Sequence, residues 1–286
     1  MNRTSPVALT IVVATALLST ACGADPQSDR PAADGHTEDA TEVGHIHGLG
    51  VDPADDTLYV ATHFGLFRVD DAGEAERVAD RWQDTMGFTV VGPGHFLGSG
   101  HPDLTEDLPP HLGLIESTDA GESWTPLALQ GEADFHILEP AGELLYAYDA
   151  TTGRLLRTED RKQFEEILTG DLVSVAATEE AEQLYATTGD GQLVSIDAST
   201  GQAQELGGLV TAYVDITADG DLVGIGPDGV VRVSDDWGES WQEAGSIGGR
   251  PAAFTVTEQG WYAATAEEAY RSSDDGESWE RVLSSS

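Results

Sequence analysis

The histidines of this chain are concentrated in its first half. None of the eight follows position 136; they are His36, His45, His47, His63, His95, His101, His111 and His136. General packing or solubility roles would spread histidines along the whole chain. Imidazole nitrogens bind zinc, copper and nickel in proteins. The concentration therefore indicates a metal or ligand site built by the first half of the sequence.

The spacing of several of these residues supports that interpretation. His45 and His47 are one residue apart, and in a β-strand residues i and i+2 point to the same face. Met86 is the only methionine besides Met1, and a thioether next to imidazoles favours copper. Asp134 lies two residues before His136 and adds a carboxylate. The pattern predicts a site for a copper or zinc ion, with no organic cofactor.

The predicted ligands share one place in a repeated unit, described below. They are His45, His47, His63, Met86, His101 and His136, with His111, Asp134 and Asp149 as further candidates. Two other interpretations stay open. Protonated histidines at this place could hold an anionic or sugar ligand, or the histidines could cap strands and bond to the backbone in Gly-rich turns.

Short strands are the elements that would position these residues. From Val43 onward, apolar stretches alternate with turn signals such as Asp-Gly and Pro-Gly, and no helical period is seen. Six runs open six similar units of about 40 residues with four strands each: HIHGLGV, MGFTVVG, DFHILEP, LVSVAAT, AYVDITA and AAFTVTE. This arrangement predicts an all-β fold, a β-propeller with six four-stranded blades. The number of blades would change by one if residues 43–52 paired with the last unit.

The repeat brings the candidate ligands to one end of the predicted propeller. In each blade, the start of the innermost strand and the end of the second strand lie at the same face. His47, Met86 and His136 are near the starts of innermost strands, whereas His63 and His101 end second strands. Asp149 takes the place of His63 in the third unit. The longest insertion, residues 101–113, lies at this same face and contains His111, so it could supply a lid ligand.

Three turns between the third and fourth strands carry one motif. They read STDAGESW at 117–124, SDDWGESW at 234–241 and SSDDGESW at 272–279. The acidic residue can accept backbone N–H bonds, the glycine permits a positive φ, and the tryptophan can pack between sheets. The predicted structural residues are Asp119, Gly121, Trp124, Asp236, Gly238, Trp241, Asp274, Gly276 and Trp279.

This motif resembles the Asp-box, S-x-D-x-G-x-x-W, of the BNR/Asp-box superfamily, which includes sialidases, sortilin-type receptors and photosystem assembly propellers. The resemblance implies a β-propeller whose Asp-box turns are structural and lie opposite the ligand site. The chain is also similar to a bacterial lipoprotein subgroup often labelled glycosyl hydrolase. Fold alone does not establish that activity.

The resemblance to sialidases is incomplete. Members with that activity clamp a carboxylate with three arginines and use a Tyr–Glu nucleophile pair. Here Arg68, Arg157, Arg232 and Arg271 recur at one position of the third strand, which indicates a packing or strand-pairing role. With 52 acidic residues, no pair of carboxylates can be singled out for glycosidase chemistry. Sialidase activity is therefore not expected, and no catalytic residue is assigned.

Charge and composition exclude several classes of partner. The chain has 13 Lys and Arg residues against 52 Asp and Glu, a net charge of −39. Such an acidic protein is repelled by nucleic acid and by anionic membrane surfaces, whereas cations are natural counterparts. One cysteine cannot form an internal disulfide. There is no Walker motif, dinucleotide glycine motif or Gly-x-Ser-x-Gly elbow.

The beginning of the chain has the features of an export signal. Residues 1–21 combine a basic start, an apolar run and small residues before Cys22. This resembles a lipoprotein lipobox, with Ser19 where leucine is usual. We predict a signal peptide over residues 1–21, lipidation at Cys22, a disordered tether over 22–42 and a propeller domain over 43–286. The expected location is extracytoplasmic, anchored to the cell membrane by lipid.

Together these features predict a binding protein with a His/Met-rich metal site at the mouth of the propeller channel. Two alternatives remain. The first is a glycoside hydrolase of sialidase-like fold, and the second is a scaffold that binds another surface protein or assembles a complex.

Overall fold

The computed structural model describes residues 43–178 and 181–284. The predicted signal peptide, Cys22 and the tether over 22–42 lie outside the described residues. Within the described ranges there is no helix long and apolar enough to cross a membrane. The regular structure in these ranges is 24 strands and one short 3-10 helix, η1 (Val78–Asp80).

The strands form six four-stranded antiparallel sheets in chain order. The first sheet contains β1 (Ile46–Asp52), β2 (Thr57–Thr62), β3 (Gly65–Val69) and β4 (Ala75–Arg77). The second contains β5 (Asp84–Gly92), β6 (His95–His101), β7 (Leu114–Ser117) and β8 (Thr125–Ala128). The third contains β9 (Phe135–Ala141), β10 (Leu144–Asp149), β11 (Arg154–Thr158) and β12 (Glu165–Thr169). The fourth sheet contains β13 (Leu172–Ala177), β14 (Gln183–Thr188), β15 (Gln192–Asp197) and β16 (Ala203–Val210). The fifth contains β17 (Tyr213–Ile216), β18 (Leu222–Ile225), β19 (Val230–Ser234) and β20 (Gln242–Ser246). The sixth contains β21 (Ala253–Thr257), β22 (Gly260–Ala264), β23 (Ala269–Ser272) and β24 (Glu280–Leu283).

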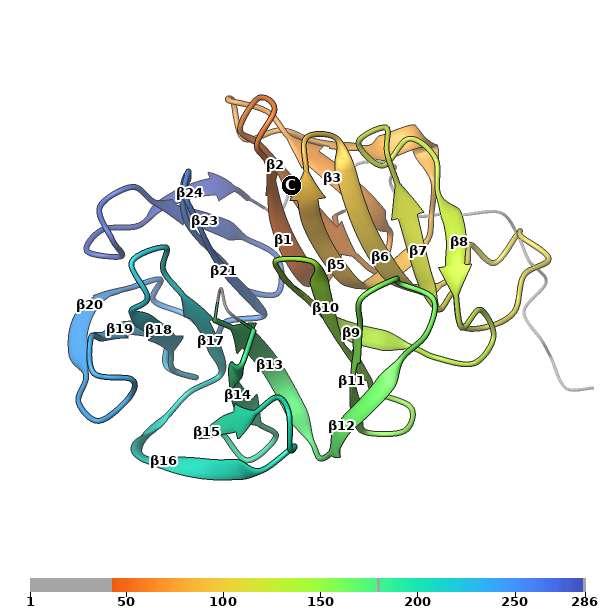
Figure 1. Cartoon of the computed structure of the whole chain (residues 1–286). Coiled ribbons are helices and arrows are strands. Elements are labelled where there is room, and N and C mark those ends of the chain that lie inside the picture. The colour runs from red at the N-terminus through yellow and green to blue at the C-terminus, as the bar shows by residue number, and fades with distance from the viewer. Residues whose placement is uncertain (1–42, 179–180, 285–286) are drawn as a thin grey trace, which may run out of the picture. The chain divides into compact units, whose positions relative to one another are not determined.

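Figure 1 shows these sheets as the blades of a β-propeller, with the first strand of each blade innermost. The predicted fold and the predicted number of blades are confirmed. β1 pairs with β2 in its own sheet, from Ile46 opposite Thr62 to Asp52 opposite Thr57. Residues 43–52 therefore do not serve as a strand of the last blade.

The propeller closes by packing between the first and last blades. Val60 and Phe67 of the first blade are fully buried in one apolar cluster with Ala264 and Leu283 of the last. The amide of Ile46 also donates to the carbonyl oxygen of Ala266 at 3.1 Å. A buried side chain the size of valine or phenylalanine contributes about 2 kcal/mol relative to exposure. Apolar burial, rather than a shared strand, holds the ring closed.

The three Asp-box turns share one hydrogen-bond pattern. In each, the first serine accepts the glycine N–H at 2.8–2.9 Å, and the aspartate accepts both the N–H and the hydroxyl of the last serine. The hydrogen bonds from serine lower the pKa of Asp119, Asp236 and Asp274. The glycines have φ of 83–91°, a conformation that suits glycine. The turns are built as the motif predicts.

The turns also lie where the repeat places them. The third strand of a blade runs parallel to the first, so it ends at the face opposite the one where the first strand begins. The Asp-box turns follow the third strands β7, β19 and β23. They are therefore on the opposite face of the propeller from His47, which lies at the start of β1.

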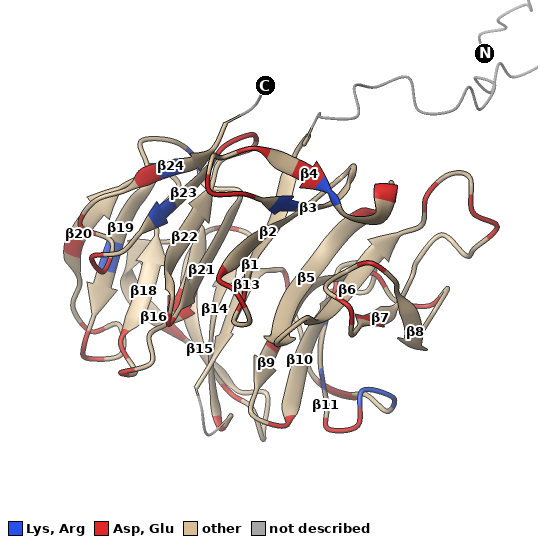
Figure 2. Cartoon of the chain, turned by 90° about the horizontal axis from the view of Figure 1, so that it is seen from above, with Lys and Arg blue, Asp and Glu red and all other residues tan. Residues whose placement is uncertain are grey.

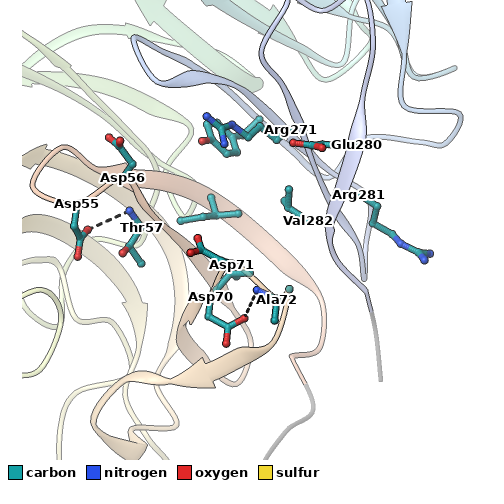
Figure 3. A pocket seen from close by; sticks show the side chains of 14 residues that line it. Asp55, Asp56, Thr57, Asp70, Asp71, Ala72, Arg271, Glu280, Arg281 and Val282 are labelled. Carbon is teal, nitrogen blue, oxygen red and sulfur yellow. Dashed lines mark hydrogen bonds between the residues drawn. The ribbon is translucent and has the colours of Figure 1, made fainter.

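The recurring arginines pair with the neighbouring outer strand. Arg68, Arg157 and Arg232 each stand opposite a glutamate in the ladder and bond to it at 2.5–3.0 Å, as in Arg68–Glu76. Arg271 donates instead to the carbonyl oxygen of Gln259 at 3.0 Å. The predicted strand-pairing role is confirmed for Arg68, Arg157 and Arg232, whereas Arg271 bonds to the turn between β21 and β22. Figure 2 shows that acidic residues are spread over many loops of the domain and that basic residues are few.

Substitution of the Asp-box glycine tests the role of these turns. A Cβ at Gly276 would lie 2.7 Å from the Trp261 ring, whereas a Cβ at Gly142, which also has positive φ, would meet nothing within 4 Å. Both alanine variants carry backbone strain of about 1–2 kcal/mol. Gly276→Ala should lose about 1–3 kcal/mol more from overpacking. Urea unfolding of the two variants measures the difference, and equal midpoints would contradict the assigned packing.

Candidate metal centre

Three histidines of the first blade converge at the mouth of the channel. His45 precedes β1, His47 is its second residue, and His63 follows the end of β2. One ring nitrogen from each lies within 4.8 Å of the other two. Ring centroids are separated by 5.0 Å for His45–His47 and 4.2 Å for His47–His63. The antiparallel pairing of β1 with β2 produces this contact, because it brings the start of one strand beside the end of the other. We refer to these three residues as the first histidine group.

A carboxylate of the next blade orients this group. Oδ1 of Asp84, the first residue of β5, lies 3.0 Å from Nδ1 of His63 and 3.8 Å from Nε2 of His47. The His63 Nδ1–H can donate to the carboxylate, which leaves Nε2 of that ring available. A metal-binding histidine commonly has such a carboxylate partner on its other nitrogen. Asp84 was not among the predicted residues; it stands two residues before Met86, in a strand whose register shifts between Thr85 and Gly87.

His47 is held in its neutral form. Its side chain is only 11% exposed, and its Nε2 has no hydrogen-bond partner among the described residues. Burial lowers the pKa of His47 from 6.5 to about 3, with further contributions from His63, His45 and His136. Metal ions bind the neutral imidazole. This ring is therefore in the ligand form throughout the pH range above about 4.

A second cluster forms between the second and third blades. His101 ends β6, His111 lies in the loop before β7, and Asp134 immediately precedes β9; one donor atom from each lies within 4.8 Å of the others. The Oδ2 atom of Asp134 is 3.6 Å from His101 Nε2, 3.9 Å from His111 Nδ1 and 3.1 Å from His136 Nε2. We refer to these four residues as the second group. The candidate ligands thus form two groups where the sequence predicts one.

Asp134 is the centre of the second group. Its side chain is 9% exposed. Burial alone would raise the pKa of Asp134, but the hydrogen bond from His136 and the nearby charges of His136, His101 and His111 lower it. Its Oδ1 and the Nδ1 of His111 are buried and have no hydrogen-bond partner among the described residues. Such atoms call for an explanation, because unsatisfied buried polar groups are rare.

One cavity reaches from the first histidine group to His136 of the second group. It has a volume of about 710 Å³ and is lined by His45, His47, Met86 and His136, with Arg250 at its wall. The thioether of Met86 therefore shares a cavity with imidazoles from both groups.

One sequence candidate, Asp149, has other partners, and so has His95, which is not among the predicted ligands. Asp149 is fully buried at the end of β10 and accepts hydrogen bonds from the amides of Asp134 and Thr151 and from the Thr152 hydroxyl. It supports the backbone beneath Asp134. His95 lies in β6, 2.8 Å from Glu116. His95 is in neither of the groups described above.

Below the mouth, the channel contains two carboxyl groups that the sequence did not single out. Glu139 of β9 accepts from the amide of Ala177, and Asp215 of β17 accepts from that of Val256. Each thus ties its innermost strand to that of the next blade. Burial raises the pKa of Glu139, as does the charge of Asp215, and burial raises the pKa of Asp215 to about 6. The sequence does carry a signal for these two residues, because each is an acidic residue in an innermost strand that is otherwise mainly apolar.

Known structures share the fold but have little sequence identity with this chain. No family model and no curated protein sequence matches it, so membership of the Asp-box superfamily is not established. A gluconolactonase from Xanthomonas campestris aligns with a TM-score of 0.64 and 13% identity, over 79% of this chain and 85% of that one. A chain of a nidogen/laminin complex gives 0.60 and 12%, over 75% and 88%. YCF48 bound to a D1 peptide gives 0.53 and 17%, over 84% and 81%. These similarities establish the fold alone.

The depressed pKa of His47 gives the metal-free protein a defined pH dependence. The unfolded chain takes up a proton on this residue near pH 6.5, whereas the folded state does so only near pH 3. Above pH 6.5 His47 is neutral in both states and does not change the free energy of unfolding. Between pH 6.5 and about 3 the unfolded state binds the proton first, so the free energy of unfolding falls by up to about 1.4 kcal/mol per pH unit. An NMR titration should give a His47 midpoint of about 3, and His47→Gln should flatten the stability profile in this window. A midpoint near 6.5 would contradict the assigned environment.

Proposed function

We propose that this chain is an extracytoplasmic, lipid-anchored β-propeller that binds a transition-metal ion, copper or zinc, at the mouth of its channel. The observation that carries the proposal is the first histidine group. Three imidazoles converge within 4.8 Å, and the buried His47 presents an unpartnered nitrogen to the others. Such an arrangement costs free energy without a ligand, since a buried nitrogen forgoes its hydrogen bond to water.

The surroundings support binding of a soft or borderline cation. The carboxylate of Asp84 orients His63 and adds negative charge next to the group. Met86 lines the same cavity as His45 and His47, and the combination of imidazole with thioether favours copper. The net charge of −39 also attracts cations to the protein.

The proposal predicts that the protein purifies with, or takes up, copper or zinc through the first histidine group. His47→Ala should remove about one equivalent, because the group then has too few ligands left to complete a four-coordinate site. Inductively coupled plasma mass spectrometry on untagged protein measures the content. His95→Ala is the matched control, since it removes a histidine outside both groups, and it should bind as the wild type does.

Wild-type protein that takes up no copper or zinc would overturn the metal proposal. Screening of glycans and hydrolysis assays would then address the glycoside hydrolase alternative, for which we assign no catalytic residue.

The proposed anchor also has a direct test. Cys22 is the only cysteine, so Cys22→Ser should abolish lipid attachment and release the protein from the membrane fraction. Detergent phase partitioning of cells that express each form measures this. His47→Ala is the control, because it should remain in the detergent phase. Wild-type protein that stays in the aqueous phase would contradict lipid anchoring.

A protein-binding scaffold is the second candidate function. The loop between β6 and β7 exposes two leucines, Leu104 at 92% and Leu108 at 40%, at the same face as the histidines. Two structures with this fold are named for complexes, one of nidogen with laminin and one of YCF48 with a peptide. Crosslinking of wild-type protein and of Leu104→Ser in membranes would show whether this loop contacts a partner.

A further inference from the structure

We propose that the second group is a separate metal site of a different kind, a zinc site formed by His101, His111 and Asp134 that joins the second blade to the third, with His136 bonded to the carboxylate. The inference deepens the proposed metal-binding function and rests on it. Four observations carry it: the distances around Asp134, the hydrogen bond that orients His101, the anchoring of His111, and a repeated arrangement between blades.

The distances around Asp134 suit a tetrahedral ion. Zinc bonds to imidazole nitrogen and carboxylate oxygen at about 2.0–2.2 Å, which places any two tetrahedral donors ~3.3–3.5 Å apart. The three ring nitrogens of the second group lie 3.1, 3.6 and 3.9 Å from Asp134 Oδ2. The donor atoms of His101, His111 and Asp134 also lie within 4.8 Å of one another, so these three can share an ion, whereas His136 at 3.1 Å donates a hydrogen bond to the carboxylate.

The tautomer of His101 favours a cation between it and Asp134. Its Nδ1 is 2.7 Å from the carbonyl oxygen of Pro110, which can only accept, so this nitrogen carries a proton. In the neutral ring, Nε2 then has a lone pair, and it faces the carboxylate oxygen at 3.6 Å. Two acceptors at this distance repel unless a proton or a metal ion lies between them. A metal ion satisfies His101, the unpartnered nitrogen of His111 and the carboxylate at once.

The backbone holds His111 in place. The amide of Leu112 donates to the carbonyl oxygen of Gly100, and the amide of Gly131 donates to that of His111, at 2.9 and 2.8 Å. His111 is therefore at the fixed base of the long loop. Its ring contacts that of His101, with centroids 5.4 Å apart. A ligand set held in this way loses little conformational entropy when a metal binds.

The two groups repeat one arrangement between successive blades. His63 follows the second strand of the first blade and contacts Asp84, at the start of the second blade's innermost strand. His101 ends the second strand of the second blade and faces Asp134, at the start of the third blade's innermost strand. Each pair is accompanied by two further histidines, His45 and His47 in one case and His111 and His136 in the other.

The two groups differ in the position of the carboxylate. Asp84 bonds to a histidine nitrogen behind the first group, whereas Asp134 is itself one of the converging donors. A set with a direct carboxylate ligand suits zinc, and imidazoles with a thioether nearby suit copper. Because its ligands come from two blades, a zinc ion in the second group would also crosslink them.

Zinc content of matched variants of the whole protein tests the proposal. After loading with zinc alone and gel filtration, His111→Ala and the near-isosteric Asp134→Asn should each bind one equivalent less than wild type. His47→Ala should keep this equivalent, and His95→Ala should match the wild type. Zinc should raise the melting temperature of His47→Ala but not that of the double variant His47→Ala/His111→Ala. Circular dichroism confirms that each variant is folded.

The outcomes separate this inference from the proposed function. Unchanged zinc content in both His111→Ala and Asp134→Asn would overturn the second site and leave the first intact, with Asp134 then the centre of a hydrogen-bond network only. Unchanged copper and zinc content in His47→Ala, with loss of zinc in the other two, would overturn the first site and support the second. Wild-type protein without bound zinc would overturn the second site, whatever copper it binds.

Discussion

Face-to-face packing of twisted four-stranded sheets around a channel is the constraint on which the rest of this structure depends. Each blade is a sheet with apolar side chains on both of its faces, so a blade can bury them only against its two neighbours. Apolar clusters accordingly span neighbouring blades, and one of them joins the first blade to the last. Closure through apolar side chains and a backbone hydrogen bond, without a shared strand, leaves the first strand free to begin its own blade. As a result, His45 and His47 lie at the channel mouth, at the start of the first blade's innermost strand, and not in a strand of the last blade.

The same packing determines how the mouth is built. Radial stacking brings the end of one blade's second strand against the start of the next blade's innermost strand. His63 therefore meets Asp84, and His101 meets Asp134. The site is formed at blade junctions, where residues distant in sequence are held by rigid strands on both sides. Deeper in the channel, Glu139 and Asp215 also bridge adjacent blades through backbone amides, so polar groups of the channel hold neighbouring blades together.

The two faces of the propeller have divided roles. At one face, the Asp-box turns satisfy their own polar groups locally, with serine, aspartate and glycine bonded within eight residues. At the other, several buried polar atoms stay unpartnered among the described residues, including those of His47, His111 and Asp134. Unpartnered buried atoms are not confined to the histidine face, since Trp241 Nε1 of an Asp-box turn is another among the described residues. The difference is that the potential metal-ligand groups found among these residues gather at the histidine face, and the proposed function rests on that convergence.

Local patterns in the sequence were enough to predict the fold and the face. Strand alternation, the turn motif and the six-fold repeat depend on neighbours in the chain, and they identified the blades, the Asp-box turns and the histidines at one mouth. The repeat alone could not show that the ligands divide into two groups, that Asp84 orients His63, or that Asp149 serves the backbone. Those features depend on the rotation between blades, which sets which side chains meet across a junction. Strand spacing within a blade is a property of the backbone, but contact between blades is decided by packing of the whole ring.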